Sequence, residues 1–88
     1  MSKKYKLLKK ELSGLHRIQA LRDFSDVKKG DVGGFIESET NLSHNGDAWV
    51  YGDARVYGNA WVSGNARVSG DARVSGDAWV SGYHGQFL

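Results

Sequence analysis

The side chains in this sequence that are capable of chemistry fall into two groups. The first group is three histidines, each of which can act as a general base near neutral pH when a substrate and an orienting partner are within reach; they are His16, His44 and His84. These histidines lack the paired spacing of metal ligands, and the chain has no cysteine, so we expect neither a metal site nor a disulfide. His44 is the best candidate for a base, because Glu37 and Glu39 are near it in sequence.

The second group consists of aromatic and arginine side chains that recur at six-residue intervals between residues 49 and 79. Trp, Tyr and Arg are the residue types enriched in the hot spots of protein interfaces. Contiguous aromatic side chains on the surface of a soluble monomer also indicate an interaction site. We therefore predict a binding interface, without catalytic residues or a cofactor, that is formed by Trp49, Tyr51, Arg55, Tyr57, Trp61, Arg67, Arg73 and Trp79.

A six-residue repeat sets the spacing of this second group. Residues 46–82 read GDAWVY, GDARVY, GNAWVS, GNARVS, GDARVS, GDAWVS and a final Gly. A strict period of six is typical of a β-solenoid. The Ala and Val of each phrase are two residues apart, so in an extended chain both point inward, and the residue between them points outward. Each Gly-Asp or Gly-Asn pair then forms a corner, where glycine adopts a positive φ without steric cost.

The phrase Val50-Tyr51-Gly52-Asp53-Ala54-Arg55 resembles the unit of the hexapeptide-repeat family. That unit has an aliphatic residue, a small residue, two free positions, a small residue and a free position. This chain departs from it at Tyr51 and Tyr57, which are large at the second position. The resemblance implies a left-handed parallel β-helix in which three phrases make one triangular coil, so that residues 18 apart stack. A right-handed solenoid is the alternative geometry.

Stacking at this interval sorts the outward side chains into three faces. The expected neighbours are Trp49 with Arg67, Trp61 with Trp79, and Arg55 with Arg73. The first pair is suited to a cation–π contact, and the second forms an apolar strip whose indole N–H groups are free. The third pair is mutually repulsive unless Asp53 or Asp71 screens the two charges. We expect the Trp61–Trp79 strip to be buried in a contact with another subunit or a partner.

Two β-capable runs precede the repeat. They occupy residues 5–12 and 15–24 on either side of Ser13-Gly14, which predicts a β-hairpin. The hairpin would cover the open end of the solenoid, where the core and the strand edges need a cap. A helix over residues 5–12 is the alternative, because Lys, Leu and Glu favour helices.

The segment between the hairpin and the repeat is expected to be irregular. Residues 25–35 are interpreted as a loop in which Gly33-Gly34 makes a tight turn, and residues 36–45 as a degenerate first turn of the solenoid. In that turn Ile36 and Leu42 are expected to point inward, with Thr40 at the small position. The distance from Leu42 to Val50 is eight residues, so two residues are inserted around His44 and Asn45.

The expected fold is therefore all-β and forms one structural unit. It comprises an N-terminal β-hairpin cap with a Gly-rich loop (residues 1–35), a short left-handed parallel β-helix of about two to three coils (36–82) and a C-terminal tail (83–88).

Charge is distributed unevenly along the chain. Residues 1–35 contain nine Lys and Arg against four Asp and Glu, a net charge of +5, whereas residues 47–82 contain three Arg against four Asp, a net of −1. A basic arm suits nucleic acid or an acidic partner. A solvated, partly frayed terminus is the favoured interpretation, and direct nucleic-acid binding is expected, if at all, only through this basic end.

A second resemblance covers most of the chain. Its recurring pieces are Arg22-Asp23-Phe24, Asp26-Val27-Lys28, Gly33-Gly34-Phe35-Ile36 and Asn41-Leu42-Ser43. With these pieces the chain is similar to small proteins of phages and prophages that are usually labelled hexapeptide-transferase-like or polymer-forming cytoskeletal-like. The resemblance implies a viral or mobile-element origin.

These observations together favour a non-catalytic protein-binding module. The expected partners are a copy of itself, as a dimer or trimer, and a host protein complex, which the chain would inhibit, for example in a CRISPR or other defence system. One alternative is a self-assembling structural scaffold. The other is a hexapeptide acyltransferase, for which the family resemblance implies a catalytic histidine at a subunit interface.

The composition also bounds the compartment. No stretch approaches the roughly 20 apolar residues of a membrane span, and no apolar run of the signal-peptide kind follows the N-terminal lysines. We therefore expect a soluble protein in the cytoplasm of the host cell.

Overall fold

The computed structural model describes residues 3–81 and the backbone of residues 86–87, so the predicted tail lies almost wholly outside the described residues. This part of the chain is all-β apart from one short 3-10 helix, η1. The elements in chain order are β1 (Tyr5–Lys10), β2 (His16–Ala20), β3 (Val32–Ile36), η1 (Glu39–Asn41), β4 (Trp49–Val50), β5 (Arg55–Val56), β6 (Trp61–Val62), β7 (Arg67–Val68), β8 (Arg73–Val74), β9 (Trp79–Val80) and β10 (Gln86–Phe87).

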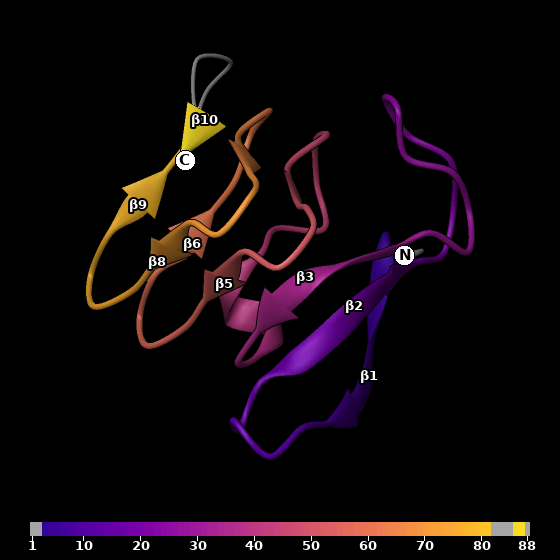
Figure 1. The fold of residues 1–88 in the computed structure, drawn as a ribbon. Helices are drawn as coiled ribbons and strands as arrows, with labels where there is room; N and C mark the ends of the chain where they lie inside the picture. Colours follow the sequence, from indigo (N-terminus) through magenta and orange to yellow (C-terminus); the bar gives the residue numbers. More distant parts are fainter. Residues whose placement is uncertain (1–2, 82–85, 88) are drawn as a thin grey trace.

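The two-residue strands stack as parallel pairs on three faces. Strand β4 pairs with β7, β5 with β8 and β6 with β9, and in each pair the partner residue is 18 positions further along the chain. The predicted stacking interval is thus confirmed. Phe35 of β3 lies opposite Arg55, and 55 − 35 gives 20, so the inserted two residues predicted for the first coil are also confirmed. Figure 1 shows β3, β5 and β8 successively along one side of the stack.

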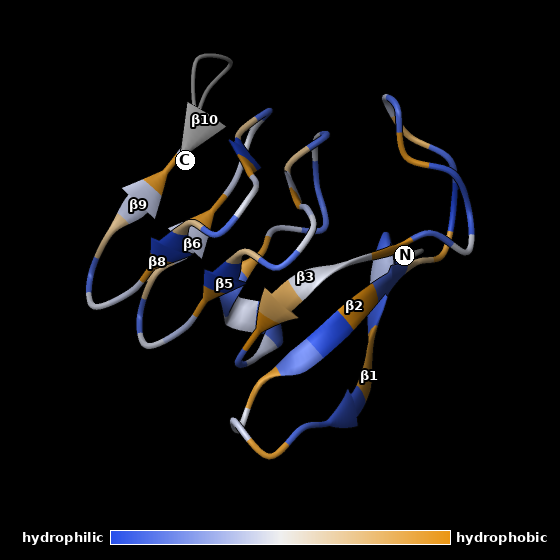
Figure 2. Cartoon of the chain, in the orientation of Figure 1, coloured by the Kyte–Doolittle hydropathy of each residue, from blue (hydrophilic) through white to orange (hydrophobic). Residues whose placement is uncertain are grey.

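A narrow column of small apolar side chains fills the inside of the stack. The Val of every phrase is at most 5 % exposed, and the Ala of each phrase is buried except Ala78, which is half-buried. Ile36 and Leu42 are fully buried at the start of the column, as predicted. Hydrophobic and hydrophilic residues accordingly alternate along the coils in Figure 2.

Each corner of the stack is a tight turn that depends on glycine. At the first regular corner the Ala54 N–H donates to the Tyr51 carbonyl at 3.1 Å, and Gly52 between them has a φ of 60°. A positive φ at the first central residue of such a turn is the arrangement for which glycine is preferred. The same turn recurs at each of the following phrases, which explains why the repeat keeps its glycine.

Hydrogen bonds between coils follow the pattern of a parallel ladder. In the regular part, the N–H of the outward residue donates to the alanine carbonyl of the next coil, as in Trp49 to Ala66 (3.2 Å) and Trp61 to Ala78 (3.0 Å). The alanine carbonyls at the N-terminal edge therefore need other donors.

Three donors from outside the repeat complete this series at the N-terminal edge. The Ala48 carbonyl accepts from the Lys4 ammonium at 2.6 Å, the Ala54 carbonyl from the Phe35 N–H at 2.9 Å, and the Ala60 carbonyl from the Asn41 side-chain amide at 2.9 Å. The corner carbonyls before them are also bonded, because Lys4 donates to Gly46, Arg17 to Gly52 and Asn41 to Gly58. Residues far apart in sequence thus act as the missing preceding coil.

The N-terminal strands extend one face of the stack as an antiparallel sheet. Tyr5 of β1 lies opposite Ala20 of β2, and His16 of β2 lies opposite Ile36 of β3. The link between β1 and β2 covers residues 11–15, longer than the expected Ser13-Gly14, and the register shifts by a bulge after Leu7. The helix considered for residues 5–12 does not form.

Three expectations about residues 1–45 are wrong. The terminus is not simply solvated, because Lys4 and Tyr5 are fully buried. Gly33 and Gly34 form no turn but lie within β3, where a Cβ atom would come within 2.5 Å of the Val50 carbonyl oxygen or 2.6 Å of the Ala54 carbonyl oxygen. Thr40, expected at the small inward position of the first turn, is exposed in η1.

Asn41 occupies the interior beside this 3-10 turn instead of Thr40. Its side-chain oxygen accepts from the backbone N–H groups of Glu37 (3.0 Å) and Ser38 (2.9 Å), while its amide nitrogen donates to the next coil. Both ends of the fully buried amide are thereby satisfied. In the irregular first coil, the Asn41 side chain therefore makes the hydrogen bonds to the next coil that backbone N–H groups make between the regular coils.

We predict that Asn41→Asp destabilises the fold by about 3 kcal/mol or more, because it replaces a buried donor by an acceptor that faces two carbonyl oxygens. Urea unfolding at neutral pH, followed by circular dichroism, measures the change. The matched control is Asn65→Asp, which places the commonest corner residue of the repeat at an exposed corner and should change stability by less than about 0.5 kcal/mol. Equal effects of the two substitutions would contradict the role given to Asn41.

Candidate binding faces

The three outward faces predicted from the repeat form as expected in register but differ in exposure. Trp49 lies beside Arg67, Arg55 beside Arg73 and Trp61 beside Trp79. The outward residues of the repeat differ between the faces, and neighbours from outside the repeat make the faces differ further in exposure. The N-terminal segment covers one face, borders the second and leaves the third open.

Trp49 does not lie on an exposed face, and its assignment to the binding interface is therefore wrong. Its side chain points away from the solenoid axis, but it is only 2 % exposed. The rings of Tyr5 and Phe24 pack against it edge-on, with centroid distances of 6.2 and 5.2 Å. A Cβ atom on Gly33 would lie 2.9 Å from the indole, so the glycine allows β3 to pass close to it. Trp49 joins the N-terminal segment to the first coil.

Tyr51 and Arg67, on the same side of the stack, interact with the 24–27 turn. The Tyr51 hydroxyl donates to Asp26 at 2.9 Å, and the Arg67 guanidinium lies 3.6 Å from the other Asp26 oxygen and donates to Ser25 at 3.0 Å. Arg67 lies over the Tyr51 ring at 5.9 Å, so the expected cation–π contact with Trp49 is replaced by one with Tyr51. Burial, followed by the Asp26 hydrogen bond, raises the pKa of Tyr51 to about 12.

Trp61 and Trp79 form the open face. Trp79 is 76 % exposed, and Trp61, its register partner one strand away, is half-buried. We call these two side chains the indole strip. Among the described residues no aromatic ring or cation packs on either indole, in contrast to Trp49.

Arg55 and Arg73 lie on the face that continues into the N-terminal sheet. The Arg55 guanidinium lies over the Phe35 ring at 5.7 Å, and Arg17 lies over the same ring at 4.1 Å. Asp53, one of the two carboxylates considered for screening the arginine pair, forms an ion pair with Arg17 at 3.1 Å. Tyr57, half-buried, lies at the side of this face.

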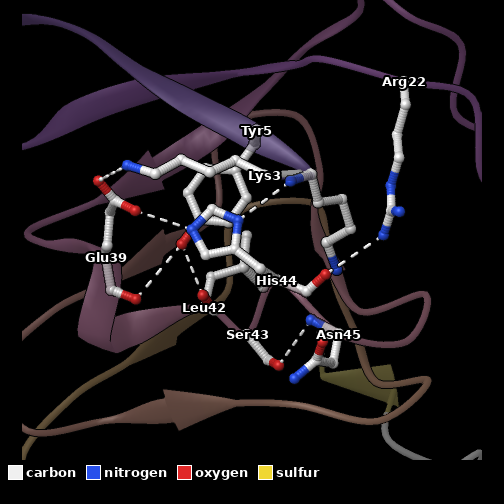
Figure 3. A network of polar contacts seen from close by, with 9 residues as sticks. Lys3, Tyr5, Arg22, Glu39, Leu42, Ser43, His44 and Asn45 are labelled. Atoms are coloured by element: carbon white, nitrogen blue, oxygen red, sulfur yellow. Dashed lines mark hydrogen bonds and ion pairs between the residues drawn. The ribbon is translucent and has the colours of Figure 1, made fainter. Parts of the chain in front are cut away.

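His44 is held in a network between the N-terminal segment and η1 (Figure 3). Its Nδ1 accepts the Lys4 backbone N–H at 3.1 Å, and its Nε2 lies 2.8 Å from a Glu39 carboxylate oxygen. The imidazole stacks on the Tyr5 ring at 4.1 Å with an interplanar angle of 10°. Because Nδ1 accepts a hydrogen bond, Nε2 carries the proton and donates it to Glu39.

Of the two carboxylates that the sequence places near His44, only one contacts it in the structure. Glu39 is the partner of His44, and its hydrogen bond from His44, with a further one from Lys3, lowers the pKa of Glu39. Glu37 is not a partner, because it accepts from the Gly58 N–H at 2.8 Å. The Tyr5 hydroxyl donates to the Leu42 carbonyl at 2.5 Å, and burial raises the Tyr5 pKa. Both ring nitrogens of His44 are thus used to join elements, and neither is free to take a proton from a substrate.

The remaining titratable candidates do not form a catalytic or metal site. His16 Nδ1 lies 2.7 Å from the Leu8 carbonyl oxygen within the β1–β2 sheet, and His84 lies outside the described residues. Burial lowers the pKa of Lys4 to about 8, with Arg22 contributing, but its ammonium is fully buried and bonded to two carbonyls. Among residues 3–81, no three His, Asp or Glu side chains come together as metal ligands would. Within the same residues, no helix has the length and apolar character needed to cross a membrane.

Sequence reasoning missed the residues that define these faces from outside the repeat. Two of them, Lys4 and Asn41, bond to edge carbonyls, and the third, Phe35, packs against arginines. None of the three belongs to a periodic pattern. The pieces Gly33-Gly34-Phe35-Ile36 and Asn41-Leu42-Ser43 were noted only for their resemblance. Their spacing from the first regular phrase was the available signal, because a 20-residue interval places them directly above residues 53–63.

A family model matches the repeat. The model of the YdcK Beta solenoid repeat matches this chain twice, over residues 48–64 and 66–82. The repeat is of a known β-solenoid type. A curated protein named "Uncharacterized acetyltransferase YdcK", from Escherichia coli (strain K12), is 46% identical over 37 residues, which are 42% of this chain. The chain spans about a tenth of the length of that relative, since the match covers 11% of YdcK. Both findings are consistent with the hexapeptide-repeat family indicated by the sequence.

The protonation of Tyr51 predicts how stability depends on alkaline pH. An unfolded tyrosine loses its proton near pH 10, whereas folded Tyr51 keeps it to about pH 12. In this window the folded state binds more protons than the unfolded state, so the contribution of Tyr51 to stability is lost as pH rises. We expect the urea midpoint of the wild type to fall more steeply between pH 10 and 12 than that of Tyr51→Phe. Parallel pH profiles for the two proteins would contradict the partial burial of Tyr51 and its hydrogen bond to Asp26.

The two described histidines should have opposite tautomers. His44 must carry its proton on Nε2, because Nδ1 accepts the Lys4 N–H, and His16 must carry it on Nδ1, because the Leu8 carbonyl can only accept. Long-range proton–nitrogen NMR spectra, recorded at about pH 8 where free imidazoles are neutral, distinguish the two forms. An Nδ1–H form of His44 would show that the network around Tyr5 and Glu39 is not the one described.

Proposed function

We propose that this chain is a non-catalytic binding module that docks on a protein partner through the indole strip. The observation that carries the proposal is the exposure of Trp79, at 76 %, beside its register partner Trp61. An exposed indole on a two-stranded sheet has a large apolar area and few rotatable bonds, which favour association. The other tryptophan of the repeat is buried by the N-terminal segment, so exposure is not the rule for this position.

The proposal gives the surrounding structure a rigid, supporting role. We propose that the solenoid is left-handed, with about two and a half coils, and that β1 and β2 form its N-terminal cap. Lys4, Arg17 and Asn41 support the cap assignment, because their side chains donate to the carbonyls of the first edge. A strand pair fixed in this way presents the indole strip with little loss of entropy on binding.

An acyltransferase is the second candidate, because the relative YdcK is named an acetyltransferase. Only the repeat is shared, and the relative is about nine times longer than the matched region, so its active residues need not be present here. The contacts of His44 argue against catalysis, since Nδ1 accepts a backbone N–H and Nε2 donates to Glu39. A general base needs a free nitrogen within reach of the substrate proton.

The partner proposed here is a protein in the cytoplasm, together with self-association of the chain as a dimer or trimer. The anti-defence role implied by the phage resemblance gains no support from the comparisons, and it is not part of the proposal. A self-assembling scaffold would use the same indole strip but only between copies of the chain. The experiment below therefore has to separate a partner from a second copy.

Capture from bacterial lysate tests the proposal. The tagged chain and a Trp61→Ala/Trp79→Ala variant are compared by mass spectrometry, with Arg67→Gln as a matched control on another face, where Arg67 pairs with Asp26. We expect a specific protein that binds wild type and Arg67→Gln and is lost, by about tenfold or more, with the double variant. Light scattering of the purified chain over a range of concentrations reports self-association. The scaffold would be favoured instead if the capture yields only the tagged chain and the scattering mass rises with concentration. That rise should then be absent in the double variant.

Acrylamide quenching of single-tryptophan variants locates the contact. A protein that retains only Trp79, the other two tryptophans being changed to Phe, should quench like free Trp when monomeric and become protected in the complex. A protein that retains only Trp49 should be protected throughout, because that indole is 2 % exposed. Quenching of Trp79 that stays at the free value in the saturated complex would exclude the indole strip as the binding surface.

A further inference from the structure

The arginine pair on β5 and β8 has an unusual electrostatic environment. Arg55 and Arg73 are register partners on adjacent parallel strands, whose spacing is roughly 4.8 Å. Like charges directly opposite each other destabilise a sheet unless something screens them. Figure 2 shows that both strands carry strongly hydrophilic residues on this side of the stack.

No carboxylate among the described residues forms an ion pair with either arginine. Asp53 pairs with Arg17 instead, and Arg67, which has the same place in the repeat, pairs with Asp26. Arg55 lies over the Phe35 ring, at 5.7 Å. The two adjacent guanidinium groups therefore retain their full hydrogen-bonding capacity on this face.

A cleft brings further donors to the same place. A hollow of about 350 Å³ lies between the β1–β2 link and the stack, and it is lined by Lys10, Ser13, Glu37, Arg55, Tyr57 and Arg73. A second hollow, of about 500 Å³, continues past the same two arginines toward Phe35, Asp53 and Asp71. Volumes of a few hundred Å³ suit small molecules.

The first hollow is positively charged and rich in donors. Three cations line it, and the single carboxylate, Glu37, is directed to the Gly58 N–H at 2.8 Å. Asp71 lies at the far side of the arginines, in the second hollow, and Asp53 is already paired with Arg17. The hydroxyl groups of Ser13 and Tyr57 add neutral hydrogen-bonding groups to the wall.

We propose that this cleft binds a small molecule that bears a phosphate group, held between the guanidinium groups of Arg55 and Arg73 with Lys10 at its side. A phosphate monoester carries close to two negative charges at neutral pH and has three terminal oxygens, so it can accept from two arginine forks at once. A carboxylate has only two oxygens and one charge, and it would be satisfied by one arginine. The phosphate would bridge the two stacked arginines, neither of which has an ion-pair partner among the described residues. This site is separate from the indole strip and does not depend on the proposed function.

Titration with inorganic phosphate and pyrophosphate, at constant ionic strength adjusted with sodium chloride, tests the proposal. The readout is the NMR signals of the arginine Nε–H groups, which resolve individual side chains. We expect saturable shifts of the Arg55 and Arg73 signals, with pyrophosphate binding more tightly than phosphate. The Arg67 signal should not follow the same curve, because Arg67 is paired with Asp26.

Substitutions assign the effect to the pair. Arg55→Gln/Arg73→Gln should weaken pyrophosphate binding by about tenfold or more, the equivalent of one lost charge-assisted hydrogen bond, whereas Arg67→Gln should leave it unchanged. Without the anion, Arg73→Gln should unfold at the same temperature as wild type or higher, because repulsion is removed. A purely structural arginine would lower that temperature.

Three results would overturn the proposal. Shifts that stay linear with concentration, or that are equal in wild type and the double variant, would show only general ionic attraction. A loss of stability in Arg73→Gln without any change in binding would assign the pair a structural role. Saturable binding of a short oligothymidylate, with none of phosphate or pyrophosphate, would make the face a nucleic-acid surface and not a small-molecule site.

Discussion

The structure depends on how each coil supplies hydrogen-bond donors to the carbonyl groups of the next. In the repeat this occurs automatically, since the N–H of each outward residue meets an alanine carbonyl one coil further on. The N-terminal edge has the same carbonyls and no coil before it, and an unpaired backbone acceptor in a dry site costs about as much as a lost hydrogen bond. Lys4 and Asn41 meet this need with side-chain nitrogens, each of which reaches a glycine and an alanine carbonyl of one corner. A lysine suits this position because its ammonium has three donors and no acceptor, and burial lowers its pKa to about 8 at the same time.

The need for these donors determines which parts of the surface remain available. Lys4 reaches its corner only because residues 3–5 lie against the first coil, and this brings the Tyr5 ring onto His44 and against Trp49. The same packing closes the Trp49 side of the stack and uses both nitrogens of His44. Among the described residues the face of Trp61 and Trp79 receives no such segment, because the part of the first coil that precedes β6 is η1 and Leu42. One structural requirement at the edge therefore separates a covered face from an open one.

The features that the repeat determines can be predicted from the sequence, and those that the non-repeating N-terminal segment determines cannot. Stacking at 18 residues, the inward Ala and Val and the glycine corners all follow from strict repetition, because each phrase experiences the same neighbours. The two-residue insertion is also readable, since it changes the interval from Leu42 to Val50. The burial of Trp49 cannot be predicted from the repeat. The repeat pattern tells only whether a side chain points toward or away from the solenoid axis, and the residues that cover Trp49 come from a segment that does not repeat. Lys4 is one of five lysines within the first ten residues, and nothing in that composition distinguishes the buried one from the solvated ones. Thr40 was assigned inward by counting back from Leu42, but the chain turns into a 3-10 helix there and Asn41 takes the interior position.

The three arginines of the repeat show where function can arise in so regular a chain. Arg55, Arg67 and Arg73 have identical neighbours in sequence, Ala before and Val after, and so begin with identical local structure. Their environments differ because of residues outside the repeat: Arg67 meets Asp26, Arg55 meets Phe35, and Arg73 faces a cleft beneath the β1–β2 link. A solenoid supplies a rigid lattice with outward positions about 4.8 Å apart from coil to coil, but that lattice alone makes every position equivalent. Recognition requires positions to differ, and in this protein the differences come from the non-repeating first 45 residues. Their contacts with the repeat, and not the repeat residues themselves, therefore determine which aromatic and basic side chains are free to meet a ligand.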